Sequence, residues 1–347
     1  MFRSILVAVD ASHAAHNAVR RAGLLAARFE ARLTLLQVLA PSVLRLPYGL
    51  FAPALGTDAR ITRAQLALGR AAAGLARDHD IHASVVVRVG DALEHIRLLA
   101  HEADLLVVGA KTRNPLHDSV LGTRAARLMQ LARHAVLVVK SPAASAYSRV
   151  LVPTDFADCS EAALRLALKM VSDRSVEVFH ALSTHRETRM RAANVPAQAI
   201  LDYVGSAREK CLRRLRAATA LANGHAAGCS VGHGDPACLS LERQKAMAAD
   251  LIVMGREGQG QSVAGGMRMG SVARQLVAKA GCDVLFIPRT ALPYLEADAR
   301  PQRPAMGFDA LASRRESEWM RREAAPMSSA CHDGKAFQGS GATVLPC

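Results

Sequence analysis

The sequence contains the same unit twice, and this duplication constrains the fold more than any other feature. Residues 3–10 (RSILVAVD) resemble residues 148–155 (SRVLVPTD) at an offset of 145 positions. Self-similarity at a nearly constant spacing indicates repeated structural units with small insertions, so the 347 residues are predicted to hold two copies of one domain. Three further landmarks recur in the same order: the Gly-Asp pairs at 90 and 234, the apolar runs 104–109 and 250–255, and the Gly-Thr and Gly-Ser pairs at 122 and 270.

Each copy alternates short apolar strands with amphipathic helices. Strands alternating with helices predict right-handed crossovers and a parallel sheet covered on both faces. We therefore expect an α/β protein made of two Rossmann-like, five-stranded α/β/α domains in tandem. The predicted domains are residues 1–142 and 148–290, joined by a linker at 143–147. The strands expected in the first copy are the apolar runs 5–9, 33–39, 85–89, 105–108 and 136–139.

The segment after the second copy differs from both copies. Residues 291–347 contain several prolines, equal numbers of acidic and basic residues and a Gly/Ser-rich end, which favours a disordered tail. A short amphipathic helix that docks on the body is the alternative, through Phe308, Leu311, Trp319 and Met320. The last strands of the two copies would be sheet edges in isolated domains, so they are predicted to pair or pack within the chain as an internal pseudo-dimer.

Composition argues against several functional classes. There is no apolar run of membrane-spanning length and no visible export signal, so we expect a cytoplasmic protein. The seven cysteines include no C-x-x-C pair, which favours reduced thiols and gives no spacing for a metal site. The net charge of +14 is spread over both copies and aromatic residues are only 4%, which argues against nucleic-acid binding but is compatible with anionic small ligands.

The conspicuous residues lie where parallel strands end, which is where ligands bind in open α/β sheets. Asp10 and Asp155 follow the first strand of each copy, where a carboxylate could accept hydrogen bonds from a ribose or a base. The alternative is that each aspartate caps the next helix. In the second copy, the fourth strand leads to Gly255 and Gly258, and a helix then opens at Gly270-Ser271. Glycine allows close backbone approach, and the free amides of a helix start suit a phosphate.

With these motifs, both copies resemble universal stress protein domains, whose loop reads Gly, two residues, Gly, nine residues, Gly and then Ser or Thr. The resemblance covers residues 3–289. It implies binding of an adenine nucleotide, ATP or AMP, with Mg²⁺ accompanying ATP. It also implies pairing of domains through their last strands, and a role in stress response without an established turnover reaction.

The resemblance assigns ligand contacts by position. In the second copy Asp155, within the signature Pro153-Thr154-Asp155-Phe156, would contact adenosine, and Ala181 would line the base. The phosphates and ribose would be held by Gly255, Gly258, Gly270 and Ser271, with backbone amides from Val272 and Ala273. The corresponding residues of the first copy are Asp10, Val38, Gly109, Thr112, Gly122 and Thr123.

Both loops depart from the family pattern. In the first copy Thr112 replaces the second glycine, and if that position requires a positive φ, a β-branched residue there costs about 1–3 kcal/mol. In the second copy eleven residues, 259–269, separate Gly258 from Gly270. Further glycines give this longer loop flexibility, and Arg268 could reach a phosphate. The second copy is therefore predicted to be the better nucleotide site.

The sequence shows no nucleophile beside a general base and no Gly-Lys-Ser/Thr phosphate loop. We therefore expect no enzyme, and at most slow, incidental ATP hydrolysis. The predicted function is that of a tandem stress protein that uses nucleotide occupancy to regulate partners or its own assembly, including homodimer formation. The alternatives are a nucleotide-free interaction or scaffold protein of the same fold and, third, an enzyme of the wider adenine-binding α/β group.

Overall fold

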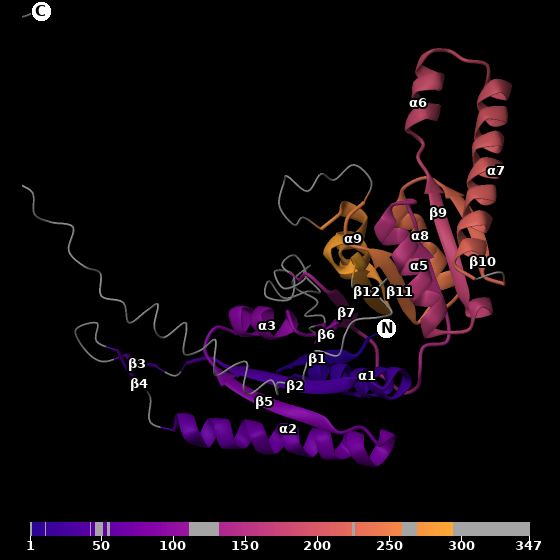
Figure 1. The fold of residues 1–347 in the computed structure, drawn as a ribbon. Helices are drawn as coiled ribbons and strands as arrows, with labels where there is room; N and C mark the ends of the chain where they lie inside the picture. Colours follow the sequence, from indigo (N-terminus) through magenta and orange to yellow (C-terminus); the bar gives the residue numbers. More distant parts are fainter. Residues whose placement is uncertain are drawn as a thin grey trace, which may run out of the picture. The chain divides into compact units, whose positions relative to one another are not determined.

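The computed structural model describes residues 2–10, 12–41, 43–45, 51–53, 56–110, 132–223, 226–258 and 269–293. Their main sheet has ten strands in the order β10-β9-β8-β11-β12-β7-β6-β1-β2-β5 (Figure 1). Each copy contributes five strands that run parallel to one another. Where the copies meet, β7 (Ala135–Val139) and β12 (Asp283–Ile287) pair antiparallel. The predicted fold class and the predicted pairing of the last strands are therefore confirmed.

In the first copy the predicted strands are present with small extensions at their ends. One feature that the sequence pattern does not indicate is a hairpin of β3 (Val43–Arg45) and β4 (Phe51–Pro53). The other elements are β1 (Ser4–Val9), α1 (His13–Phe29), β2 (Arg32–Leu39), α2 (Thr57–His79), β5 (Ala83–Val89), α3 (Ala92–Ala100) and β6 (Leu105–Gly109).

The second copy repeats this order and adds a helical extension. After β9 (Val176–Leu182), the helix α6 (His185–Ala192) and the first part of α7 (Ala197–Leu221) project beyond the sheet (Figure 1). The other elements are β8 (Val150–Pro153), α5 (Asp158–Met170), the short 3-10 turn Asp173–Ser175, β10 (Gly228–His233), α8 (Pro236–Ala246), β11 (Leu251–Gly255), α9 (Ser271–Lys279) and the 3-10 turn Arg289–Ala291.

Local sequence explains where these elements begin and how they are buried. The Ser12 side chain accepts a hydrogen bond from the Ala15 amide and caps the start of α1. Glu30 is the C-cap of this helix and has a left-handed φ of 51°. Every residue of β11 and β12 is buried, as expected for inner strands of a sheet with helices on both faces. The alternating strand and helix pattern of the sequence therefore specifies both the elements and their layering.

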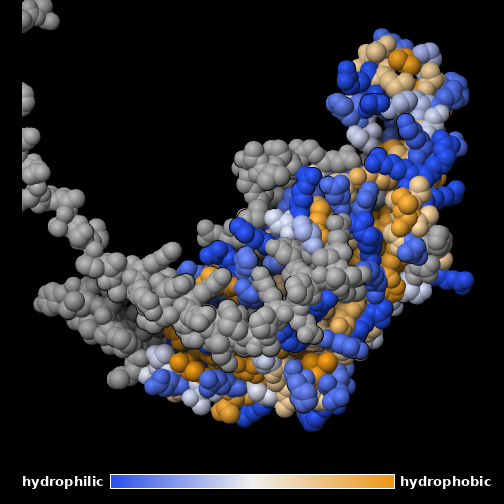
Figure 2. All heavy atoms as spheres, in the orientation of Figure 1, coloured by the Kyte–Doolittle hydropathy of each residue, from blue (hydrophilic) through white to orange (hydrophobic). Residues whose placement is uncertain are grey.

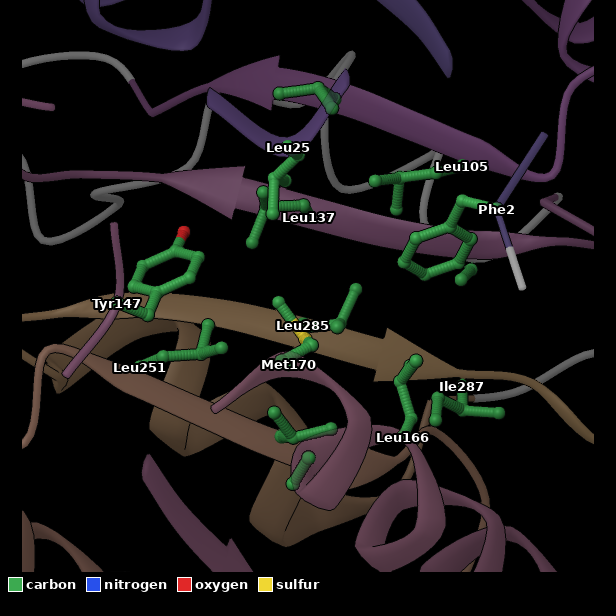
Figure 3. Packing of buried hydrophobic residues seen from close by; sticks show 14 of the residues in the cluster. Phe2, Leu25, Leu105, Leu137, Tyr147, Leu166, Met170, Leu251, Leu285 and Ile287 are labelled. Carbon is green, nitrogen blue, oxygen red and sulfur yellow. The ribbon is translucent and has the colours of Figure 1, made fainter. Parts of the chain in front are cut away.

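One apolar core runs through both copies (Figure 3). Leu137 of β7 and Leu285 of β12 are paired across the junction, and both are fully buried. Leu166 and Met170 of α5 belong to the same core. Complete burial of one leucine side chain contributes about 1.5–3 kcal/mol, so the same kind of packing that stabilises each copy also joins the two.

A buried polar cluster lies at the same junction, centred on Asp283, which is 0% exposed. Its Oδ1 accepts hydrogen bonds from the amides of Lys140 (2.8 Å) and Ser141 (3.0 Å). Its Oδ2 accepts one from the Tyr147 hydroxyl (2.7 Å) and lies 3.3 Å from Nε of Arg21, a residue of α1. The Arg21 guanidinium stacks 3.9 Å over the Tyr147 ring. These five residues, the Asp283 cluster, tie the first copy and the linker to the second copy.

Lys140 should make stability depend on pH. Its ammonium donates to the Ala280 carbonyl (2.7 Å), but burial lowers its pKa from 10.5 to about 8, with Cys282 and Asp283 opposing the shift. Between those pKa values the unfolded chain holds a proton that the folded chain has lost, so stability rises with pH. Between pH 7 and 10, we expect the wild type to gain about 2 kcal/mol relative to Lys140→Met, allowing for partial exposure of the ammonium.

The measurement is the urea-unfolding free energy of wild type and Lys140→Met at several pH values. Comparing the two proteins cancels the titration of all other groups, including Cys282, whose pKa burial raises to about 12. A difference between the two proteins that stays constant from neutral to alkaline pH would show that Lys140 titrates normally in the folded chain.

Some predictions concern residues outside the described ranges. The tail beyond residue 293, including the alternative helix through Phe308 and Trp319, is among them. Within the described part of the chain, no helix combines the length and apolar character needed to cross a bilayer. In the same part no three His, Cys, Asp or Glu side chains are grouped so as to hold a metal ion.

Candidate functional site

A pocket of about 360 Å³ lies at the carboxyl ends of the strands of the second copy. Its walls come from the ends of β8, β9 and β11 and from the starts of α8 and α9. This is the edge at which open α/β sheets bind ligands, and the volume lies within the usual range for small-molecule sites. The described face of the molecule carries both hydrophilic and hydrophobic side chains around its elements, as Figure 2 shows.

The pocket brings together the ten described residues of the second copy that were predicted to bind the nucleotide. They come from four separate stretches of the chain, which only the resemblance associates with one another. The ten are Pro153, Thr154, Asp155, Ala181, Gly255, Gly258, Gly270, Ser271, Val272 and Ala273.

The carboxylate of Asp155 is held in a fixed orientation. Its Oδ1 accepts hydrogen bonds from the Ala157 amide (3.0 Å) and from Oγ of Ser160 (2.7 Å). Its Oδ2 is turned toward Gly258, where a Cβ atom on the glycine would lie 3.1 Å away. The N-cap of α5 is Ala157, so the alternative of Asp155 as a helix cap is wrong. The site thus presents a preoriented acceptor.

Asp10, the counterpart in the first copy, has different partners. Its Oδ1 accepts from the Ser12 amide (3.0 Å) and, at short range, from the Ser12 hydroxyl. Ser12 is the N-cap of α1, so the helix-cap alternative is also wrong for Asp10. The position that matches Ser160, counted from the aspartate, is Ala15, which has no hydroxyl. The two aspartates are therefore oriented by different residues.

Two glycines of the motif are required by helix packing. A Cβ atom on Gly255 would lie 2.7 Å from Cβ of Cys159 on α5, and one on Gly109 would lie 2.6 Å from the carbonyl oxygen of Ala14 on α1. Gly258 is different because its nearest neighbour is the Asp155 carboxylate. The described glycines with positive φ are Gly56, Gly90 and Gly234 only. Gly258 is not among them. The position that Thr112 occupies in the first copy is therefore not shown to need a positive φ, and the energetic cost expected for Thr112 has no support from its counterpart.

The start of α9 offers backbone donors to the pocket. Gly270 is its N-cap and provides no side-chain cap, and the first helical bond runs from the Arg274 amide to the Gly270 carbonyl. The amides of Ser271, Val272 and Ala273 precede that bond, and such amides favour anions. The Gly270 amide itself donates to the Arg256 carbonyl (3.0 Å), which joins the two ends of the long loop. Arg268 lies outside the described residues.

Arg256 and Glu257 line the pocket, although no sequence motif marks their role. Arg256 is only 2% exposed, and its Nη1 donates to the carbonyl of Ala132 in the first copy (2.6 Å). Its Nε donates to Oε1 of Glu257 (2.7 Å), while Oε2 accepts from the Arg289 amide (3.0 Å). The guanidinium therefore fastens the pocket wall to the first copy.

Six other lining residues were also missed. None belongs to a motif, and their placement follows from the register of β9 and β11 and from the first turns of α5 and α8. They are Ser160, Phe179, His180, Pro236, Ser240 and Met254.

In the first copy only part of the equivalent site is described. Asp10, Val38 and Gly109 are placed at the ends of β1, β2 and β6, whereas Thr112, Gly122 and Thr123 lie outside the described residues. At two matching positions the first copy carries a larger side chain than the second. Val38 stands in place of Ala181, and Ile96 stands in place of Ser240. Ile96 and Ser240 correspond because each lies five residues after the aspartate that caps its helix, Asp91 or Asp235.

The Universal stress protein family model matches residues 1–140 and again residues 146–288. A universal stress protein from Archaeoglobus fulgidus DSM 4304 is 18% identical, with a TM-score of 0.59 over 83% of this chain and 98% of that one. A functionally unknown protein from Pseudomonas aeruginosa PAO1 is 18% identical, with a TM-score of 0.55 over 85% of this chain and 96% of that one. A universal stress protein in complex with cAMP is 23% identical over 40% of this chain and 97% of that one, with a TM-score of 0.31. No curated protein matches.

Proposed function

Because this chain belongs to the universal stress protein family and carries the domain twice, we propose that it binds an adenine nucleotide in its second copy. Occupancy would regulate partners or assembly during stress, and catalysis is not part of the role. The observation that carries the proposal is the convergence of the ten second-copy motif residues on one pocket of about 360 Å³.

We propose one orientation for the nucleotide in this pocket. Asp155 would accept hydrogen bonds from the ribose or base, and Ala181 would line the base. The phosphates would lie at the start of α9, where the amides of Ser271 and Val272 and the Ser271 hydroxyl can donate. ATP and AMP both satisfy this arrangement, with Mg²⁺ accompanying ATP.

The described lining supports regulation more than phosphoryl transfer. Arg256 is its one guanidinium or ammonium side chain, and it is committed to Ala132 and Glu257. Transfer of a phosphoryl group is accelerated by cations that stabilise the charge of the transition state. The described lining of the pocket offers no such cation to the ligand, and we propose that any ATP hydrolysis is slow and incidental.

Titration calorimetry with ATP on the full-length protein tests the proposal. We expect saturable binding of one ATP per chain, because the first copy carries the larger Val38 and Ile96 at the positions of Ala181 and Ser240. Two equivalent sites would show that the first copy binds as well as the second. The absence of any binding heat, together with a melting temperature indifferent to ATP, would overturn the proposal.

A nucleotide-free scaffold is the second candidate, and the antiparallel pairing of β7 with β12 favours it. Duplication would then serve to build an internal dimer, whether or not the pocket is filled. Protein purified under native conditions without bound adenine absorbance, and unresponsive to added ATP, would favour this candidate.

The remaining assignments are also proposals. We propose domain bounds of 1–142 and 148–290, a linker at 143–147 and a tail at 291–347. We further propose a cytoplasmic location and, beyond the internal pairing of copies, assembly into a homodimer. Limited proteolysis followed by mass spectrometry would test the bounds, since linkers and tails are cut before folded domains.

A further inference from the structure

The helix α6 and the first part of α7 project from the second copy and bury little apolar surface (Figure 1). No residue of α6 is buried, and in the first half of α7 only Ile200 is. Polar contacts nonetheless hold the projection in place. Oε2 of Glu187 on α6 lies 3.1 Å from Nε2 of His233 on β10. Nη1 of Arg186 donates to the Tyr203 hydroxyl (3.4 Å) and joins α6 to α7. The projection is therefore anchored at its base, while its outer surface stays exposed.

The end of this projection carries no charge over ten residues. Between Arg191 and Asp202 the sequence reads AANVPAQAIL, and all but two of these residues are exposed. The largest exposed side chain among them is Leu201, which is 64% exposed. Figure 2 shows hydrophobic atoms gathered at this end and hydrophilic atoms along the sides of the projection. Residues 192–201 thus form an uncharged tip that loses few hydrogen bonds when it leaves water.

Cationic side chains stand behind the uncharged tip. Helices α6 and α7 together carry eight Arg and Lys residues against three Asp and Glu. Two of the three carboxylates pair with an arginine of their own helix, and the third, Asp202, accepts a hydrogen bond from Gln198 (3.0 Å). In the described part of the chain, no acidic side chain pairs with Arg189, Arg208 or Lys210. All three are exposed, so the sides of the projection present unneutralised positive charge.

The spacing along α7 places apolar and cationic groups at matching depths. Leu201, Val204 and Arg208 follow one another at intervals of three and four residues, so they lie on one face of the helix. At a rise of 1.5 Å per residue, Arg208 stands about 10 Å behind Leu201 along the helix axis. Amphipathic elements bury their apolar side chains about 5–10 Å deep at a bilayer surface. A tip inserted to that depth would bring Arg208 to the level of the lipid phosphates.

We propose that the uncharged tip docks on an anionic lipid surface, with the cations of α6 and α7 against the phosphate groups. A second copy of this chain is a poorer occupant, because each chain carries a net charge of +14 and would bring like charges together. A protein partner would need a hollow that matches a projecting end, whereas a fluid lipid surface adapts to it. Docking of this kind requires no membrane-spanning helix.

Co-sedimentation of the full-length protein with vesicles tests the inference. Vesicles of phosphatidylcholine alone are compared with vesicles that also contain phosphatidylglycerol, at low and at high salt. We expect binding to the anionic vesicles to be at least about tenfold stronger, and to weaken with salt because the paired charges are exposed to solvent. Equal binding to both kinds of vesicle, or binding to neither, would overturn the inference. No residue of the uncharged tip lines the pocket, so the outcome does not depend on nucleotide binding.

A substitution in the tip shows whether this part of the chain makes the contact. Leu201→Asp puts a carboxylate where an apolar side chain would insert, and should weaken binding to anionic vesicles by more than about tenfold. The matched control is Leu66→Asp, the same change at a leucine of α2 that is 58% exposed. It alters the net charge equally and should leave binding within about twofold of the wild type. Equal losses in the two variants would contradict docking through the tip.

Paired charge removals test the role of the cations. Arg189→Gln combined with Arg208→Gln should weaken binding about 25-fold, since each cation near an anionic surface strengthens binding about fivefold. The control, Arg63→Gln combined with Arg70→Gln, removes the same charge from exposed positions of α2. Equal losses would show that net charge alone attracts the lipid, and would overturn the inference. A wild type that ignores vesicles but forms a dimer, which Leu201→Asp dissociates, would identify a second copy as the occupant instead.

Discussion

Replacing Asp283 by alanine is expected to lower the free energy of unfolding by about 3–5 kcal/mol, the largest stability effect that we predict for this chain. The carboxylate is 0% exposed and accepts hydrogen bonds from Lys140, Ser141 and Tyr147. Its removal leaves these donors unsatisfied and leaves the buried Arg21 guanidinium without its counter-ion. Urea unfolding followed by circular dichroism measures the loss.

Two further variants show whether the effect comes from the buried pair. Asp202→Ala removes an exposed carboxylate of α7 and should change stability by no more than about 0.5 kcal/mol. Arg21→Met combined with Asp283→Leu removes both charges, and should cost less than Asp283→Ala alone because no unpaired charge remains. A double variant as unstable as the sum of its two single variants would contradict this account.

The alternation of apolar runs and amphipathic helices was sufficient to predict the fold. The expected strands 5–9 and 136–139 appear as Ser4–Val9 and Ala135–Val139, because a strand buried on both faces must be apolar throughout. The Asp283 cluster could not be predicted in this way. Asp283 stands where the first copy has the buried Ala135, and its partners Arg21 and Tyr147 are distant in sequence and meet it only in the folded chain.

The site was predictable where the chemistry resides in a motif and unpredictable where it depends on register. Asp155 and Gly258 are close in the structure because adjacent strands end at the same edge of the sheet. The motif did not give the physical reason for each glycine, since Gly255 is required by contact with Cys159. Nor could a sequence pattern show that His180 and Arg256 line the same pocket, because His180 bonds to Thr154 and Arg256 to Ala132, and both partners are distant in sequence.

Replacing Asp155 by alanine is expected to weaken ATP binding by about 10- to 100-fold, the largest effect on binding that we predict. Hydrogen bonds to charged groups contribute more than neutral ones, and Ala157 and Ser160 already hold this carboxylate in position, so little ordering is needed when a ligand binds. The measurement is the dissociation constant for ATP by calorimetry, with the melting temperature of the variant as a check of folding.

The matched comparison is Asp10→Ala, the same change at the same position of the first copy. Asp10 is engaged with Ser12, and the first copy has Val38 and Ile96 where the second copy has the smaller Ala181 and Ser240. If the second copy alone binds nucleotide, Asp10→Ala should change the dissociation constant by less than about threefold, well under 1 kcal/mol. Equal losses in both variants would mean that the two copies bind together, and a loss confined to Asp10→Ala would place the nucleotide in the first copy. Because the two substitutions are chemically identical, any difference between them reports the surroundings of each carboxylate.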